Sequence, residues 1–280
     1  MDKIKIITDS TCDLPKEYIE KYDIEVMPVL INFGEESYLE GVEITRDEMI
    51  ERIERENTLP TTAQITPIRF EECYRKYIDE GYKVLAIHMS SKMSGTYQSA
   101  LIAKNEFNDE DLVVIDGYTI TSALGMVVLK AARMVEAGNS LQEIEKELLV
   151  YTHKIKSGLM FVSLDNLVRG GRLSKGKAII VSALGIKLIL NMDDGEMNVA
   201  TKVRGSKKAV KEIIKDFEAV KRKEGEPVIL INYELEVADA LREYLEENNI
   251  DYIETTTGCA VAIHSGKNAG GLFYVEDYSI

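Results

Sequence analysis

The sequence is short of cationic residues, cysteine and metal-binding patterns, and each shortage excludes a class of protein. Lys and Arg total 34 against 48 Asp and Glu, so the 280 residues carry a formal net charge of −14. A charge this negative repels phosphate backbones and anionic lipids, which disfavours nucleic-acid binding and docking on a membrane surface. The three cysteines, Cys12, Cys73 and Cys259, form neither a Cys-x-x-Cys pair nor a zinc pattern. We therefore expect a reduced protein without a structural metal.

Long apolar runs and several catalytic motifs are also missing. The most apolar stretch, residues 178–190, contains Lys187 and is too short to span a bilayer. The N-terminal residues interleave charged and apolar side chains, unlike a signal peptide. These features predict a cytoplasmic protein without stable membrane insertion. Gly-x-Ser-x-Gly, a P-loop, and Gly-x-Gly-x-x-Gly after the first strand are all absent, which disfavours hydrolase and dinucleotide-binding folds.

The composition and the pattern of the first half predict an α/β protein. Hydrophobic residues make up 45% of the chain and charged residues 29%, which is ordinary for a globular protein. The length favours about two domains, each large enough to bury a core. Strand patterns at 3–7, 24–33, 82–89 and 112–115 alternate with helical patterns. This alternation predicts a mostly parallel sheet with flanking helices.

Strands are more closely spaced in the second half of the chain. Strand patterns at 186–192 and 197–203 flank an Asp-Asp-Gly turn, which is typical of a hairpin. The apolar stretch 259–264 is also expected to form a strand. The mixture predicts an α+β fold, so we expect an N-terminal α/β domain at 1–155 and a C-terminal α+β domain at 156–280.

The most informative stretch is HMSSKMSGTYQSA, residues 88–100. A strand is expected to end at Met89 and a helix to begin near Gly95, which makes Ser94 the expected N-cap. The serine hydroxyl and the free N–H groups at the positive end of the helix dipole can hold an anion. The position also lies at the carboxyl end of a parallel strand, where α/β sheets bind ligands. A plain capped helix remains the alternative.

A second hydroxyl cluster occupies PTTAQITP, residues 60–67. Thr66 followed by Pro67 predicts a helix start with proline at its first position. The loop before this helix would then hold Thr61, Thr62 and Gln64. The cluster is either a helix start only or the second side of a site for a carboxylate or phosphate.

A third cluster surrounds a double glycine in LDNLVRGGRLSKGK, residues 164–177. Gly170 and Gly171 are expected to end a short helix, because glycine permits positive φ. Arginine presents a rigid fork that suits carboxylate or phosphate groups. The cationic residues around the break are Arg169, Arg172 and Lys175.

The remaining candidates are one histidine and one basic segment. His264 lies in AIHSGKNAGG, after an expected strand and before glycine-rich sequence, where loops often carry function. A structural role is the alternative for His264, and it is the expected role of His88, whereas His153 is expected on the surface. Residues 202–223 hold nine basic and three acidic residues. This segment is either a solvated helix face or a docking surface for an acidic or phosphate-bearing partner.

In their order and spacing these motifs resemble the DegV family, the fatty-acid-binding proteins that serve as the FakB component of bacterial fatty acid kinase. The resemblance covers essentially the whole chain. Its motifs are IITDSTCDLP, TAQITP, SSKMSGTYQSA, VIDGYTITSALG, LVRGGRLS, KVRGSKKA and HSGKNAGG. Two motifs depart from the usual family pattern: TAQIT stands in place of T-S-Q-P-S, and Lys267 and Asn268 follow Gly266.

The resemblance implies a two-domain DegV-like fold with a long-chain fatty acid bound between or near the domain junction. Thr62 and Ser94 would hydrogen-bond the fatty-acid carboxylate, with His264 in the same network. Gly95 and Arg172 would support this network. The protein would need no cofactor and no metal of its own.

The resemblance also implies a kinase partner, which Arg204 would contact. The kinase subunit would bind ATP and its metal, and the product would be an acyl phosphate. The chain would then be no enzyme on its own. Two alternatives stay open: a stand-alone phosphotransferase or hydrolase that uses Ser94 and His264, and a lipid carrier or sensor that works without a kinase.

Overall fold

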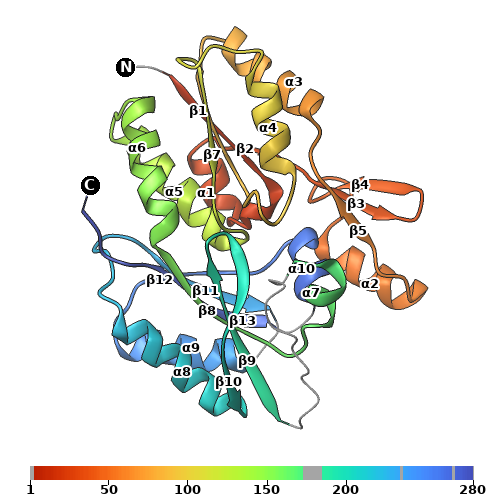
Figure 1. Cartoon of the computed structure of the whole chain (residues 1–280), viewed down its shortest axis with the longest axis vertical. Coiled ribbons are helices and arrows are strands. Elements are labelled where there is room, and N and C mark those ends of the chain that lie inside the picture. The colour runs from red at the N-terminus through yellow and green to blue at the C-terminus, as the bar shows by residue number, and fades with distance from the viewer. Residues whose placement is uncertain (1–2, 173–184, 234–235, 267–268, 280) are drawn as a thin grey trace. The chain divides into compact units, whose positions relative to one another are not determined.

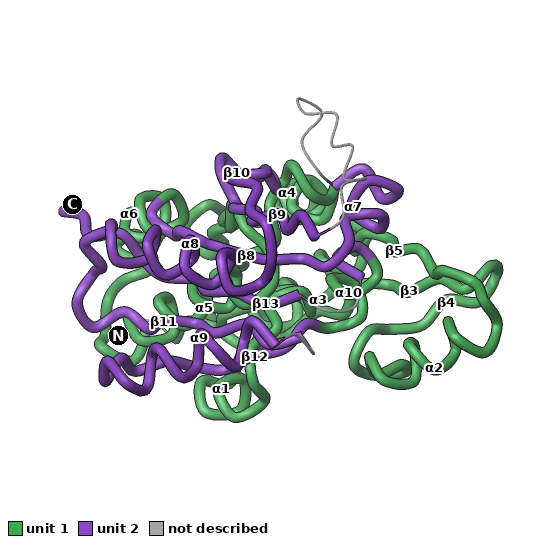
Figure 2. The backbone as a smooth tube through the Cα atoms, turned by 90° about the horizontal axis from the view of Figure 1, so that it is seen from below, with its two compact units in different colours: residues 1–153, 258–263 green, residues 154–257, 264–280 purple. Residues whose placement is uncertain are grey.

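The computed structural model describes residues 3–172, 185–233, 236–266 and 269–279 (Figure 1). The chain divides into two compact units, which Figure 2 distinguishes by colour. Unit 1 comprises residues 1–153 and 258–263, and unit 2 comprises residues 154–257 and 264–280. The segment 258–263, which we expected in the second domain, therefore groups with unit 1.

The centre of unit 1 is a four-stranded parallel sheet of order β2-β1-β6-β7. Its strands are β1 (Ile4–Asp9), β2 (Glu25–Met27), β6 (Lys83–His88) and β7 (Leu112–Asp116). β1, β6 and β7 are almost entirely buried, as expected for parallel strands that helices cover on both faces. Helices α3 and α4 lie on one side of this sheet, and α5 and α6 lie on the other (Figure 1).

The helices of unit 1 have well-defined starts. Both α2 and α6 begin with a capping box, formed by Thr45 with Glu48 and by Ser140 with Glu143. The α-helices are α1 (Lys16–Lys21), α2 (Arg46–Glu56), α3 (Pro67–Asp79), α4 (Thr96–Lys104), α5 (Ser122–Glu136) and α6 (Leu141–Tyr151). Short 3-10 helices span Ser10–Cys12 and Thr152–Lys154.

Unit 1 also contains a small antiparallel sheet of order β4-β3-β5. It consists of β3 (Leu30–Phe33), β4 (Glu36–Leu39) and β5 (Thr61–Ala63). The single strand predicted over 24–33 is wrong, because β2 and β3 belong to different sheets. Pro28 lies between them, and proline lacks the N–H that a continuous strand needs.

Unit 2 is built on a six-stranded sheet of order β10-β9-β8-β13-β11-β12. β12 pairs parallel with β11, and the other neighbours pair antiparallel. The strands are β8 (Ile155–Phe161), β9 (Ile186–Asp193), β10 (Glu196–Arg204), β11 (Val228–Tyr233), β12 (Tyr252–Thr255) and β13 (Ala269–Val275). The hairpin predicted around Asp-Asp-Gly is confirmed, since β9 and β10 are joined by Asp194 and Gly195, both at positive φ.

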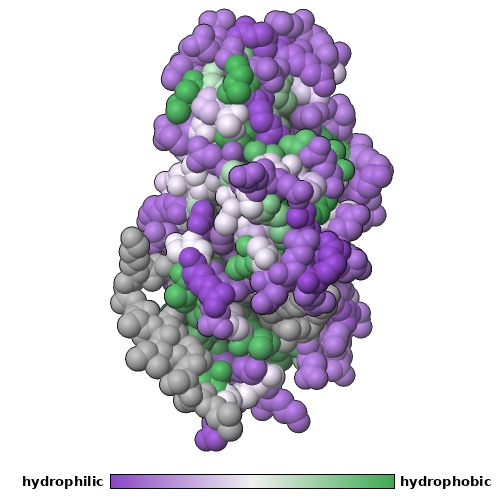
Figure 3. All heavy atoms as spheres, turned by 90° about the vertical axis from the view of Figure 1, so that its right-hand side faces the viewer, coloured by the Kyte–Doolittle hydropathy of each residue, from purple (hydrophilic) through white to green (hydrophobic). Residues whose placement is uncertain are grey.

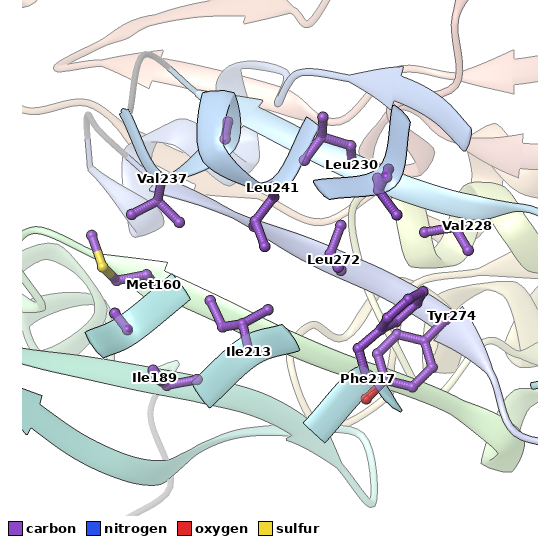
Figure 4. Close-up of a cluster of buried hydrophobic side chains, with 13 residues drawn as sticks. Met160, Ile189, Ile213, Phe217, Val228, Leu230, Val237, Leu241, Leu272 and Tyr274 are labelled. Carbon is purple, nitrogen blue, oxygen red and sulfur yellow. The ribbon is translucent and has the colours of Figure 1, made fainter. Parts of the chain in front are cut away.

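The core of unit 2 lies between this sheet and helices α8 (Ser206–Ala219) and α9 (Glu236–Glu247) (Figure 4). Ile213 and Phe217 of α8 face the strands, as does Leu241 of α9. The predicted α/β class, with a parallel sheet first and a mixed α+β part second, is confirmed.

Unit 2 also contains α7 (Asp165–Gly170), and α10 (Cys259–Ser265) has its last two residues there. The strand predicted at 259–264 is wrong, because this segment forms α10. A short apolar run does not by itself distinguish a strand from a buried helix. Alanine at positions 260 and 262 favours the helix.

Hydrophilic side chains predominate on the face in Figure 3, with apolar residues between them. Among the residues that the structure describes, the large apolar side chains that are more than half exposed are Val42, Ile68, Leu149 and Val168. They come from different elements of the chain, and scattered residues of this kind are normal on a protein surface. Among the described helices, none is long and apolar enough to cross a membrane.

Candidate functional site

The carboxyl ends of β1, β6 and β7 meet at one edge of the parallel sheet, the usual ligand-binding edge of this architecture. Asp9, the last residue of β1, is fully buried there and accepts a hydrogen bond from the Met89 N–H at 2.9 Å. Its carboxylate also lies 3.2 Å from Nδ1 of His88, and Nε2 of His88 lies 3.3 Å from the Tyr74 hydroxyl. Both ring nitrogens of His88 are thus occupied, which fits the structural role expected of it.

Ser94 is half-buried in the loop between β6 and α4. Its Oγ accepts a hydrogen bond from the Thr96 N–H at 3.2 Å and lies 3.0 Å from the Thr96 hydroxyl. The N-cap of α4 is Gly95, so the prediction that Ser94 is the N-cap is wrong by one residue. Ser94 still stands at the start of this helix, where free backbone N–H groups favour an anion.

Thr62 is half-buried in β5, where it pairs with Ile31 of β3. The loop expected around Thr62 is therefore a short strand, and α3 begins at Pro67 with Thr66 as its N-cap, as predicted. After β5, the Gln64 side chain reaches α4, and its Nε2 donates a hydrogen bond to the Ser99 hydroxyl at 3.0 Å. The structure thus connects the segments that carry Thr62 and Ser94, the two hydroxyl clusters expected to form one site.

Gln64 lies against the main chain of Gly95. A Cβ placed on Gly95 would lie 2.8 Å from Cδ of Gln64 and closer still to its Oε1. The φ of Gly95 is −74°, a value open to any residue, so a Cβ here conflicts with the position of the Gln64 amide and not with the backbone conformation. This close approach could not be read from the sequence.

His264 lies in α10 and not in the loop after a strand that we expected. Within unit 2 its imidazole packs against the end of α7, so that a Cβ on Gly170 would lie 3.0 Å from Cε1 and closer to Nδ1. Burial and the nearby Arg172 guanidinium lower the pKa of His264 to about 4. The imidazole is therefore neutral at pH 7, and one of its two ring nitrogens carries a hydrogen.

Arg172 follows the double glycine that ends α7. Gly171 is the C-cap, with φ of 66°, as predicted from its residue type. The Arg172 guanidinium donates a hydrogen bond to the Gly170 carbonyl, which keeps this cation beside His264. Arg169 is exposed, and Lys175, the third cation of the predicted cluster, lies outside the described residues, as do Lys267 and Asn268.

The sequence analysis missed a pair of carboxylates at the start of α10. Asp13 accepts a hydrogen bond from the Gly258 N–H at 2.8 Å, and Glu40 accepts one from the Ala260 N–H at 2.8 Å. Each carboxylate also accepts a hydrogen bond from a hydroxyl group. Removal from water is the largest influence on both groups and raises the pKa of each above its ordinary value. The pair fixes the first turn of α10 within unit 1.

The basic segment is exposed at the end of β10 and the start of α8. Arg204 is the last residue of β10 and pairs with Ile186 of β9. Its side chain is exposed, as are those of Lys202, Lys207, Lys208 and Lys211. No acidic residue interrupts residues 202–211. This part of the chain therefore presents a positive surface on a protein of negative net charge.

The predicted site residues fall into two groups. Thr62, Ser94 and Gly95 belong to unit 1, whereas Arg172 and His264 belong to unit 2. Each group offers donors that suit an anion: hydroxyls beside a helix start in unit 1, and an imidazole beside a guanidinium in unit 2. Within the residues that the structure describes, no group of three or more His, Cys, Asp or Glu side chains could hold a metal ion.

Comparison with known proteins finds relatives along the full length. The profile of the family described as "Uncharacterised protein, DegV family" matches residues 3–277. A DegV domain-containing protein of Clostridium perfringens is 64% identical over 279 residues, which are 99% of this chain and 100% of that protein. A second such protein, from Clostridium acetobutylicum, is 48% identical with the same coverage.

Two solved structures are similar over the whole fold. One is described as fatty acid binding of a DegV family protein from Thermus thermophilus. It has a TM-score of 0.88 at 30% identity and covers 98% of this chain and 100% of that one. The other is described as DegV, a fatty acid binding protein from Bacillus subtilis, with a TM-score of 0.85, 30% identity, and coverage of 99% and 100%.

Proposed function

The chain belongs to the DegV family, and we propose that it binds a long-chain fatty acid and presents the carboxylate to a partner kinase. The observation that supports fatty-acid binding is the full-length similarity to two solved DegV proteins described as fatty acid binding. Presentation of the carboxylate to a kinase is proposed from the family resemblance of the motifs and from the exposed basic segment around Arg204.

Burial of the acyl chain supplies most of the affinity in this proposal. Each buried methylene contributes about 0.8 kcal/mol, so a chain of about 15 methylenes offers on the order of 12 kcal/mol. The loss of translational and conformational freedom on binding offsets a large part of this gain. The polar contacts at the carboxylate then set the orientation of the lipid more than the strength of its binding.

The carboxylate needs several donors, because an unpaired buried charge is expensive. We assign this role to the hydroxyls of Thr62 and Ser94 and to the imidazole of His264. Gly95 places no side chain at the start of α4, and Arg172 adds positive charge beside His264. A neutral imidazole can donate one N–H to a carboxylate, and the bound anion would in turn favour protonation of the ring.

The kinase supplies the chemical step. Its bound ATP and metal provide the phosphoryl group, an oxygen of the fatty-acid carboxylate attacks the γ-phosphorus, and ADP leaves. The product is an acyl phosphate, and this chain contributes only the bound and oriented carboxylate. Arg204, in the exposed basic segment, is assigned to the surface that meets the kinase.

Replacement of the two hydroxyl groups tests the carboxylate site. Thr62→Val removes a hydroxyl with little change of volume, and Ser94→Ala removes the other. We expect both variants to retain less fatty acid after purification while they melt near the wild-type temperature. Matched controls are Thr61→Val and Ser91→Ala, because both residues are exposed neighbours of the same type.

The comparison of acid with alcohol makes this test specific. A fatty alcohol of the same length lacks the charged group, so its affinity should change little in Thr62→Val and Ser94→Ala. If both variants hold fatty acid as the wild type does, the carboxylate lies elsewhere. Turnover of a small phosphate ester or acyl ester by the chain alone, lost in Ser94→Ala, would instead favour an independent enzyme.

A further inference from the structure

One polar side chain connects the two segments of unit 1 that carry Thr62 and Ser94. Gln64 follows β5 immediately and donates its Nε2–H to the Ser99 hydroxyl of α4 at 3.0 Å. β5 belongs to the three-stranded sheet, whereas α4 packs on β6 and β7 of the parallel sheet. The Gln64 side chain therefore ties the three-stranded sheet, which carries Thr62, to helix α4, which begins just after Ser94.

Core packing does not explain the position of this side chain. Gln64 is exposed, whereas the next residue, Ile65, is fully buried. An exposed glutamine held in one conformation loses side-chain entropy, which a specific contact must offset. The contact provides a hydrogen bond to Ser99, a residue that is only 2% exposed, and van der Waals contact with Gly95.

Gly95 leaves the space that the Gln64 amide occupies. A Cβ at position 95 would lie 2.8 Å from Cδ and 3.2 Å from Nε2 of Gln64, and nearer still to Oε1. Ordinary carbon contacts begin near about 3.5 Å, so an alanine would displace the amide. The amide can reach Ser99 in this way only because residue 95 has no side chain.

We infer that Gln64 is a positioning residue, which fixes Thr62 relative to Ser94 by locking β5 to the start of α4 through Gly95 and Ser99. The roles of Thr62 and Ser94 rest on the proposed function, whereas the lock itself is a property of unit 1.

Hydrogen exchange tests the lock without any lipid. In Gln64→Ala the amides of β5 should exchange faster than in the wild type, because the strand loses its tie to α4. Gln98→Ala is the matched control, since Gln98 is an exposed glutamine of α4. Gln64→Met keeps the length of the side chain without its amide, so it separates the hydrogen bond from the packing on Gly95. Equal exchange in Gln64→Ala and Gln98→Ala would overturn the lock.

Ligand preference tests the consequence. Gln64→Ala should bind a fatty acid about fivefold to tenfold more weakly, the range for one lost hydrogen bond, while the affinity for the matched fatty alcohol stays within about twofold. Equal losses for acid and alcohol would mean general loosening and would overturn the positioning role. Wild-type protein that binds neither lipid would refute the proposed function. The contact of Gln64 with α4 would then be tested by hydrogen exchange only.

A double-mutant cycle tests the role of Gly95. Gly95→Ala should weaken acid binding in the wild-type background to an extent similar to Gln64→Ala, because the new Cβ displaces the Gln64 amide. In the Gln64→Ala background the same change should cost less, because no amide is left to displace. Equal costs in the two backgrounds would show that Gly95 acts independently of Gln64 and would overturn the inference.

Discussion

The contact between α7 and His264 can be tested by one added methyl group. Gly170→Ala places a Cβ 3.0 Å from Cε1 of His264 and closer to Nδ1. An ordinary carbon contact is near 3.5 Å, so the ring must move by about 1 Å. Gly170 is the last residue of α7 and does not have a positive φ. Backbone conformation therefore does not oppose the substitution.

Two effects of opposite sign act on the stability of Gly170→Ala. Alanine in place of glycine favours a helix by up to about 1 kcal/mol. Overpacking against a buried ring costs about 1–3 kcal/mol. The packing cost equals or exceeds the helix gain, so Gly170→Ala should melt at or below the wild-type temperature. Fatty-acid affinity is the better measurement, because a displaced His264 would lose the hydrogen bond that we propose it donates to the carboxylate.

The expected loss of affinity follows from the value of that hydrogen bond. Hydrogen bonds to charged groups contribute about 1.5–3 kcal/mol, which corresponds to a loss of at least about tenfold. Isothermal titration with a fatty acid measures it, with Val168→Ala as the control, because Val168 is an exposed residue of the same helix. Wild-type affinity in Gly170→Ala would refute the reasoning, as would an equal loss when His264→Ala is already present.

Three further outcomes are expected. Burial raises the pKa of Glu40 above its ordinary value of 4.5. The protonated Glu40 side chain therefore contributes fully to the stability of the fold below pH 4.5, and this contribution falls as the pH rises through the folded-state pKa. The free energy of unfolding of Glu40→Gln, measured with urea, should therefore increase relative to that of the wild type as the pH rises. A difference between the two that stays constant with pH would contradict this. The NMR signals of His264 should titrate near pH 4 in the lipid-free protein, because burial and Arg172 lower its pKa to about 4, and bound fatty acid should raise that value. Arg204→Ala should reduce acyl phosphate formation with the kinase while lipid binding stays unchanged, in contrast to Arg55→Ala on the exposed face of α2. Lost lipid binding in Arg204→Ala would refute that division of roles.

Local patterns in the sequence predicted the elements that depend on neighbouring residues. The parallel strands ending at Asp9, His88 and Asp116 were recognisable because buried strands form short apolar runs. The turn at Asp194 and Gly195 was recognisable from its residue types. Where local pattern was ambiguous, the prediction failed: the apolar run in α10 reads equally as a strand.

Contacts between residues that are far apart in the sequence could not be predicted from local patterns. Asp13 and Glu40 hold the start of α10 from more than 200 residues away in sequence, and no motif links them. The sequence places Gln64 in a polar loop but does not indicate its contact with Ser99, which lies 35 positions later. The candidate site could therefore be predicted as a set of residues, whereas the side chains that position those residues required the fold.

The central claim is that this protein holds a fatty acid, and mass spectrometry of its bound lipid tests that claim most directly. Purified protein is denatured, extracted with organic solvent, and the extract is compared with that of Thr62→Val and Ser94→Ala. We predict one long-chain fatty acid per wild-type chain, at a level near stoichiometric, and less in both variants. An extract without fatty acid, repeated after incubation of the protein with a mixture of fatty acids, would contradict the account.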